Sequence, residues 1–127
     1  MPRIPEQTLT AIGRMTVAAT ELEHVLAWIG ADQAGGDAAA VFARPGEPLR
    51  AARGSVQFAA LAHREEFIRH VEGAATQLAR SQSALRALWR EDTRVDPAVF
   101  DEIATFLLRC RDNLQALVAT RLGAAGR

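Results

Sequence analysis

Three long stretches of the chain repeat apolar residues at intervals of three and four positions, and this spacing constrains the fold more than any other feature. The first stripe comprises Ile12, Met15, Ala19, Leu22, Leu26 and Ile29. The second comprises Ile68, Val71, Ala75, Leu78, Leu85 and Trp89. The third comprises Phe100, Ile103, Leu107, Cys110, Leu114 and Leu117. Side chains three and four apart share one face of an α-helix, so each stripe predicts an amphipathic helix packed against other helices.

Glycine and proline residues divide the chain between these stripes. The glycine pair at 35–36 ends the first expected helix, and Arg44–Pro48, with two prolines and a glycine, is the strongest break. Asp96 before Pro97 is typical of an N-cap with proline at the first helical position. Four main helices are therefore expected, over about residues 5–33, 48–62, 64–91 and 97–122, with a short piece over 38–42 capped by Asp37. No breaker separates the second helix from the third, so their continuity stays open.

The chain is expected to fold as one domain over residues 1–127. Gly123 is expected to end the last helix, so that residues 122–127 form a frayed tail. Apolar residues make up 49% and charged residues 24%, which is typical of a globular chain. Long helices joined by short links pack as antiparallel neighbours. The expected fold is an all-α, up-and-down bundle of four main helices, with a Pro/Gly loop between the first and the second.

Composition narrows the partners. The formal net charge is zero, whereas nucleic-acid binders carry a basic excess, so nucleic acid is not expected as a partner unless the chain is a ribonuclease. No stretch approaches about 18 continuous apolar residues and no targeting segment is evident, so we expect a cytoplasmic protein without a membrane partner. All basic residues are arginine, a bias typical of GC-rich bacterial genomes. The single cysteine, Cys110, lies on a stripe and is expected to be a small buried hydrophobe.

No metal or cofactor site is expected. Glu21 and His24 have the Glu-x-x-His spacing of di-metal bundles, but such sites need two of these motifs and two further inward glutamates. His24 lies about 200° around the helix from Leu22, on the face opposite the stripe. His63 and His70 are seven positions apart, about two helical turns, which is too far to share one metal ion. The sequence also lacks a Gly-x-Ser-x-Gly turn and a Gly-rich phosphate loop.

Polar and amphipathic side chains at the end of the second stripe are predicted to tilt inward. Relative to Val71 at the stripe centre, Gln82 falls about 20° away and Arg86 about 60°. Trp89 falls about 0° away on the same scale. These side chains are candidate binding residues, because inward polar groups need partners or cost about 1–3 kcal/mol each.

Arg111 is a further inward candidate, about 40° from Leu107 on the last helix. Glu21 or Glu23 on the first helix is expected to supply carboxylates to these inward polar groups. Two interpretations of this polar set stay open. It is a structural network or a polar strip at a homodimer seam, or it lines a pocket for a small ligand or RNA.

Three features together resemble the HEPN-type helical bundles. They are the Glu-Leu-Glu-His segment at residues 21–24, the long third helix ending in Ala-Leu-Trp at 87–89, and the capped last helix. Many HEPN-type proteins are dimeric, metal-independent ribonucleases of bacterial defence or toxin–antitoxin systems, and others are non-catalytic partners. The resemblance covers most of the chain and implies a helical bundle that works as a dimer.

The catalytic signature of that family is Arg, four to six residues and then His, with Asn, Asp or His after the Arg. Arg64 and His70 fit this spacing, but Glu65 follows the arginine. The resemblance would assign proton transfer to His70 and stabilisation of the phosphorane charge to Arg64. A second register, anchored on Trp89, places Ser81, Gln82 and Arg86 where Arg, Asn and His would stand. We favour this second register, in which the catalytic pair is lost.

The sequence therefore favours a non-catalytic, all-α interaction module that self-associates, with a protein partner as a further possibility. Trp28 lies about 120° from Leu22 and is expected on an exposed side of the first helix. One alternative is a HEPN-like ribonuclease that uses Arg64 and His70. Another is a small-ligand binder that uses Gln82, Arg86 and Arg111, again without a cofactor.

Overall fold

The computed structural model describes residues 3–90 and 95–125; the side chains of 33–34 and 120–125 are not part of this description. Within these ranges every regular element is helical. The elements in chain order are α1 (Glu6–Ala34), α2 (Ala38–Phe42), α3 (Glu47–Ser55), the 3₁₀ helix η1 (Val56–Phe58), α4 (Leu61–Ala87) and α5 (Pro97–Ala125). The prediction of an all-α helical bundle is confirmed.

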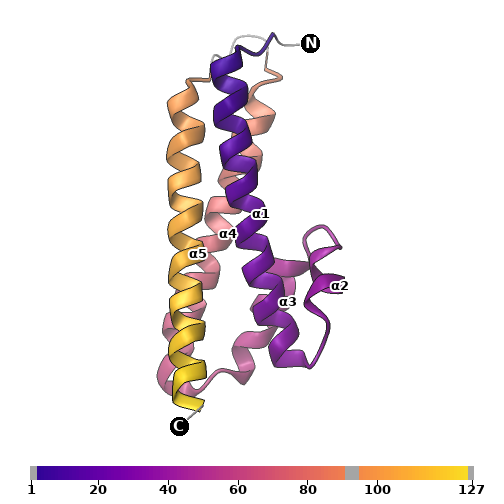
Figure 1. The fold of residues 1–127 in the computed structure, drawn as a ribbon, viewed down its shortest axis with the longest axis vertical. Coiled ribbons are helices and arrows are strands. Elements are labelled where there is room, and N and C mark those ends of the chain that lie inside the picture. The colour runs from indigo at the N-terminus through magenta and orange to yellow at the C-terminus, as the bar shows by residue number, and fades with distance from the viewer. Residues whose placement is uncertain (1–2, 91–94, 126–127) are drawn as a thin grey trace.

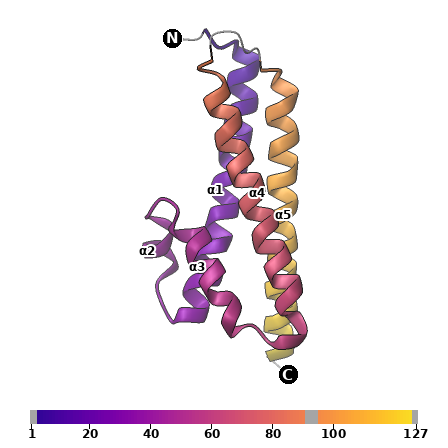
Figure 2. The same ribbon diagram turned by 180° about the vertical axis from the view of Figure 1, so that it is seen from behind.

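The three longest helices run side by side. In Figure 1, α1 runs downward, α4 upward and α5 downward, so α1 and α5 are parallel and α4 is antiparallel to both. Figure 2 shows α4 in front of this pair when the molecule is seen from behind. The short helices α2 and α3 pack beside the lower half of α1. The α1–α5 face turned toward the viewer in Figure 1 is therefore not covered by α4.

Most of the predicted helix boundaries rest on the expected capping groups. Gly35 ends α1 with a φ of 70°, and its N–H donates to the carbonyl of Ala31. Gly46 precedes α3 with a φ of 79°, a left-handed conformation that glycine adopts without strain. Asp37 and Asp96 each accept a hydrogen bond from the backbone N–H two residues on, at 3.0 and 2.9 Å.

The second and third expected helices are separate, and the second is shorter than expected. Helix α3 ends at Ser55, and after η1 the backbone is extended at Ala59 and Ala60, with ψ of 145° and 139°. Arg64 holds this corner, because its Nη2 donates to the carbonyls of Gln57 and Ala59 at 3.2 and 3.1 Å. The Arg64 side chain therefore satisfies backbone carbonyls that would accept from backbone N–H groups in a continuous helix.

Two further helix ends differ from the expectation. Helix α4 ends at Ala87 and continues as a turn through Trp89, rather than as a helix to residue 91. Helix α5 continues past Gly123 to Ala125, because one glycine in a helix costs only about 1 kcal/mol and does not by itself end it. Of the expected frayed tail at 122–127, residues 122–125 instead continue α5, and residues 126–127, like the chain at 91–94, lie outside the described residues.

The core is formed largely by the predicted stripes of α1 and α5. The largest fully buried side chains are Phe100, Met15, Leu22, Leu26, Ile103, Leu107, Leu114, Val71 and Pro48. Cys110 is half-buried and packs against this core, and its burial raises the pKa of the thiol. A neutral thiol in this position packs as a small apolar side chain.

The buried face of α4 differs from the predicted stripe. The residues that face the core on α4 and the turn after it are Phe67, Val71, Ala74, Leu78, Ser81, Leu85 and Leu88. The stripe members Ile68 and Trp89 are instead 41% and 61% exposed. The observed spacing repeats every seven residues, and a straight helix drifts by about 20° per such repeat. A fixed step of 100° per residue therefore loses the core face by the end of α4.

An exposed ion pair joins α3 to α4, and its contribution to stability is expected to depend on pH. Arg53 donates two hydrogen bonds of 2.8 Å to Glu72, and these bonds lower the pKa of the Glu72 carboxyl. The stabilisation is therefore complete above the pKa of Glu72 in the unfolded chain and is lost as the pH falls through its lower folded value. A double-mutant cycle with Arg53→Ala and Glu72→Gln is expected to give a coupling energy under about 1 kcal/mol at pH 7. Coupling that persists in acid, after Glu72 is protonated, would contradict this origin.

Candidate functional site

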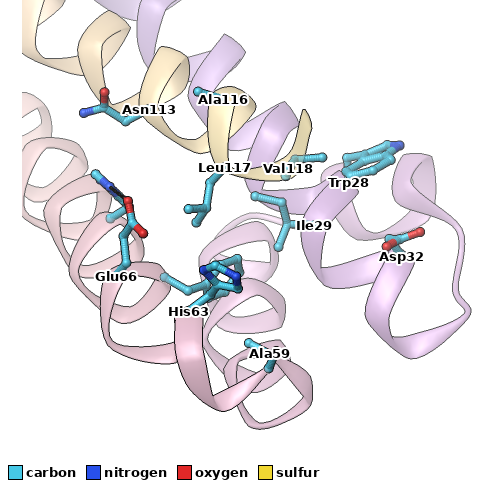
Figure 3. Close-up of a pocket in the computed structure, with 13 residues that line it drawn as sticks. Trp28, Ile29, Asp32, Ala59, His63, Glu66, Asn113, Ala116, Leu117 and Val118 are labelled. Carbon is cyan, nitrogen blue, oxygen red and sulfur yellow. Dashed lines mark ion pairs between the residues drawn. The ribbon is translucent and has the colours of Figure 1, made fainter. Parts of the chain in front are cut away.

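A pocket of about 530 Å³ lies at the end of the bundle where α1 and α5 finish and α4 begins (Figure 3). Its apolar wall includes Ile29, Phe67 and Leu117, one from each of the three long helices. Its polar lining comprises Asp32, His63, Glu66, His70 and Asn113. Figure 3 shows Leu117 and Ile29 pointing into the space, with Asp32 and Glu66 on opposite sides of it. The pocket is therefore amphipathic, with carboxylates and imidazoles around an apolar wall.

The two histidines of α4 both line this pocket, which the sequence did not predict. The Nε2 atom of His70 lies 3.8 Å from Oε1 of Glu66 one turn earlier, a contact that becomes an ion pair when His70 is protonated. His63 lies two turns from His70 on the same helix. Among the residues described, no group of three or more His, Cys, Asp or Glu side chains is placed to hold a metal ion. The pocket offers hydrogen-bonding and charged groups without a metal-ligand geometry.

Arg64 and His70 do not form a joint site within the chain. They are six positions apart on α4, which separates them by about 120° around the helix and about 9 Å along it. The Nη2 of Arg64 is occupied by the corner carbonyls described above, and its buried Nε has no hydrogen-bond partner. His70 lines the pocket beside Glu66 instead. Arg64 is thus a cap for the α3–α4 corner.

The inward side chains expected at the end of α4 point outward. Gln82 and Arg86 are exposed, and Trp89, in the turn after the helix, is largely exposed. The prediction that these side chains tilt inward is wrong. The core-facing positions of α4 repeat every seven residues, so a fixed step of 100° per residue places the core face at the wrong residues by the end of the helix. Ser81 is buried in their place, and its hydroxyl donates to the carbonyl of Leu78 at 2.7 Å.

The predicted pairing of Arg111 with the first helix is present. Arg111 donates through Nη1 to Glu21, and through Nε and Nη2 to Asp112 at 3.0 and 2.8 Å. Glu23 is not its partner; it is half-buried, and burial raises the pKa of its carboxyl. The exposed His24 makes an edge contact with Phe42 of α2, with ring centroids 5.3 Å apart.

A second hollow, of about 640 Å³, follows the α1–α5 face. Arg14 of α1 crosses it at one level and donates to both oxygens of Asp101 on α5, at 3.0 and 3.4 Å. Glu21 and Arg111 cross it about two turns farther along. The apolar residues that line it between these ion pairs are Val17, Ala18, Ala104 and Leu108. Val17 is 59% exposed, which makes it one of the most exposed large apolar side chains of the described part.

Comparisons of this chain with protein-family models, with curated proteins and with solved structures give no match. The resemblance to HEPN-type bundles therefore stays a prediction. Across the described ranges, none of the helices combines the length and apolarity needed to cross a bilayer. The assignment of function rests on the two hollows and on the positions of the candidate residues.

Proposed function

We propose that this protein is a non-catalytic helical interaction module that works as a homodimer in the bacterial cytoplasm. The observation that carries the proposal is the α1–α5 face, where an exposed Val17 lies between two cross-helix ion pairs and no other described helix covers it. An apolar centre with a polar rim is the usual composition of a protein–protein interface. The charged groups on this face are already paired, so covering the apolar centre does not isolate an unpaired charge.

Among the described residues, the candidate catalytic side chains are not assembled into one site, which supports a non-catalytic role. Arg64 is engaged with backbone carbonyls, and His70 lines a different part of the surface. Gln82 and Arg86 are exposed side chains on α4 rather than members of an enclosed pocket. Neither register of the HEPN-like signature places two reacting groups within hydrogen-bonding distance in one chain.

Sizing by multi-angle light scattering tests the proposal. At micromolar concentrations, the particle mass is expected to be twice that of one chain. A strict monomer over the whole concentration range would contradict the homodimer. The ribonuclease alternative is tested separately by incubating the protein with RNA. Cleavage that disappears in His70→Ala but persists in the exposed control Gln82→Ala would establish that alternative in place of the proposal.

One observation favours a second function, the binding of a small ligand at the bundle end. The pocket places the carboxylates of Asp32 and Glu66 on opposite sides of an apolar space, with the half-exposed Trp28 ring at its edge. Carboxylates and an aromatic face together attract an organic cation, while the apolar wall accommodates its hydrocarbon part. The ligand class that this lining fits is a protonated amine with a hydrocarbon side group. It differs from the earlier assignment to Gln82, Arg86 and Arg111.

A thermal-shift measurement is expected to distinguish this ligand class. Phenethylamine at about 100 times its dissociation constant would stabilise the fold by about 2.7 kcal/mol and raise the melting temperature. Phenylacetate, of matched size and opposite charge, is expected to produce no rise. In the double variant Asp32→Asn with Glu66→Gln, the amine is expected to lose its effect. Equal shifts with both compounds, or none with the amine, would remove this second function.

A further inference from the structure

The hollow along the α1–α5 face, called the α1–α5 groove from here on, is bordered by four ionised side chains. Their charges alternate in sign around its apolar centre. At one level α1 carries the positive Arg14 and α5 the negative Asp101. Two turns along α1 the order is reversed, with the negative Glu21 on α1 and the positive Arg111 on α5. Arg111 also binds Asp112, whose side chain is 62% exposed and lies outside the groove lining. Arg14, Asp101, Glu21 and Arg111 thus form the four corners of the groove. Adjacent corners carry opposite charges, and diagonal corners carry like charges.

A surface of this kind is complementary to a second copy of itself. When two copies meet face to face about a two-fold axis perpendicular to the helices, the helices of one copy run antiparallel to those of the other. Arg14 then lies opposite Glu21 of the partner subunit, and Asp101 lies opposite Arg111 of the partner subunit. All four corners meet an opposite charge, which favours the encounter and fixes its register.

The apolar residues lie at the centre of the same symmetry. Val17 and Ala18 are midway between Arg14 and Glu21 along α1, so the axis passes beside them. On α5, Thr105 lies close to the midpoint between Asp101 and Arg111 and also lines the groove. Docking about this axis brings the exposed Val17 against Val17 of the partner subunit and removes both from water.

Helix direction selects this antiparallel arrangement over a parallel one. A two-fold axis along the helices would also match the charges, because Arg14 would then meet Asp101 of the partner subunit. However, α1 and α5 already run in the same direction within one chain (Figure 1). The parallel arrangement would align four helix dipoles, whereas the antiparallel one opposes them pairwise, which is the favourable orientation.

We propose that the α1–α5 groove is the homodimer interface, with two chains docked antiparallel about an axis through Val17 and near Thr105. This inference rests on the proposed homodimer and assigns the face and the orientation. Arg14 and Glu21 form reciprocal interchain ion pairs, and Asp101 and Arg111 form a second reciprocal set. Apart from Thr105, the residues around the axis are apolar, and the charged corners exclude other registers, because a shift along the helices would bring like charges together.

Exchanging the two charges of the Arg14–Asp101 ion pair tests the interface and the orientation of the dimer together. The double variant Arg14→Glu with Asp101→Arg keeps an ion pair inside each chain, so the fold is retained. In the antiparallel dimer it places like charges opposite each other at all four corners. In a parallel dimer every corner would still meet an opposite charge. Sedimentation velocity is expected to show dimerisation weakened by about 100-fold in this variant.

The quadruple variant is the matched control. Adding Glu21→Arg with Arg111→Glu reverses the second level as well and restores complementarity, so it is expected to recover most of the dimerisation. Circular dichroism verifies that both variants remain helical. A wild-type chain that is monomeric would overturn the homodimer itself. A wild-type dimer that is unaffected by the double variant would overturn only this interface and orientation, as would a quadruple variant that stays as weak as the double.

Discussion

Replacing Phe100 by alanine is expected to lower the free energy of unfolding by about 3–5 kcal/mol. Phe100 is 0% exposed and is the largest fully buried side chain described. It lies in the first turn of α5, where it belongs to the cluster shared with α1 and α4. Its removal takes away the transfer free energy of the ring and leaves a cavity that rigid helices fill only in part. Urea denaturation at a fixed chain concentration measures the loss.

The chain contains a matched control for this substitution. Phe58, in η1, is 59% exposed, so the same change to alanine removes a ring that is mostly in water. Phe58→Ala is expected to change the free energy of unfolding by no more than about 0.5 kcal/mol. Similar losses for the two variants would mean that burial does not distinguish these positions and that the packing of α5 is described incorrectly.

A single added methyl group at Gly30 is expected to destabilise the protein by about 1–3 kcal/mol. Gly30 is the point where α1 meets α3. A Cβ there would lie 2.5 Å from the Cβ of Ala51 and 2.8 Å from its backbone carbon. Backbone atoms cannot rotate away as a long side chain can, so the two helices must separate. The projection formed by α2 and α3 would then lose part of its contact with α1.

The same substitution at Gly73, glycine to alanine, is expected to stabilise the protein instead. It lies within α4, and a Cβ there would meet nothing within 4 Å. Gly73→Ala is therefore expected to raise the free energy of unfolding by about 0.5–1 kcal/mol, because alanine loses less entropy in a helix. Chemical denaturation of the two variants side by side tests the pair. A stabilising Gly30→Ala would contradict the close approach of α1 and α3.

The helical bundle was predictable because its information is local. Met15, Leu22 and Leu26 repeat at helical intervals, and Asp96 before Pro97 identifies the start of α5 from adjacent residues. The failure at Trp89 and Gln82 has a local cause too, since a small error in the angle per residue accumulates along the 27 residues of α4. The break between α3 and α4 stayed open in the sequence, because hydrogen bonds of Arg64, rather than a glycine or a proline, hold that corner.

The candidate sites depend on tertiary arrangement, and only part of them was predictable. A carboxylate of α1 was expected to pair with an inward polar group, and Glu21, one of the two candidates, does pair with Arg111, because both lie near the apolar stripes of their helices. Arg14 and Asp101 were not paired, since their contact requires knowing that α1 and α5 run parallel. The pocket was missed because Asp32, Glu66 and Leu117 come from three helices, and nothing in their local sequence indicates that their ends meet.

Site-specific cross-linking tests the dimer at its proposed centre most directly. In a Cys110→Ala background, Val17→Cys places one thiol per chain beside the two-fold axis, and Gln82→Cys places one on the exposed face of α4 as a control. A disulfide needs Cα atoms within about 7 Å. Under mild oxidation, Val17→Cys is expected to form a covalent dimer and Gln82→Cys to stay monomeric. Failure of Val17→Cys to cross-link, or equal cross-linking at both positions, would contradict the antiparallel α1–α5 dimer.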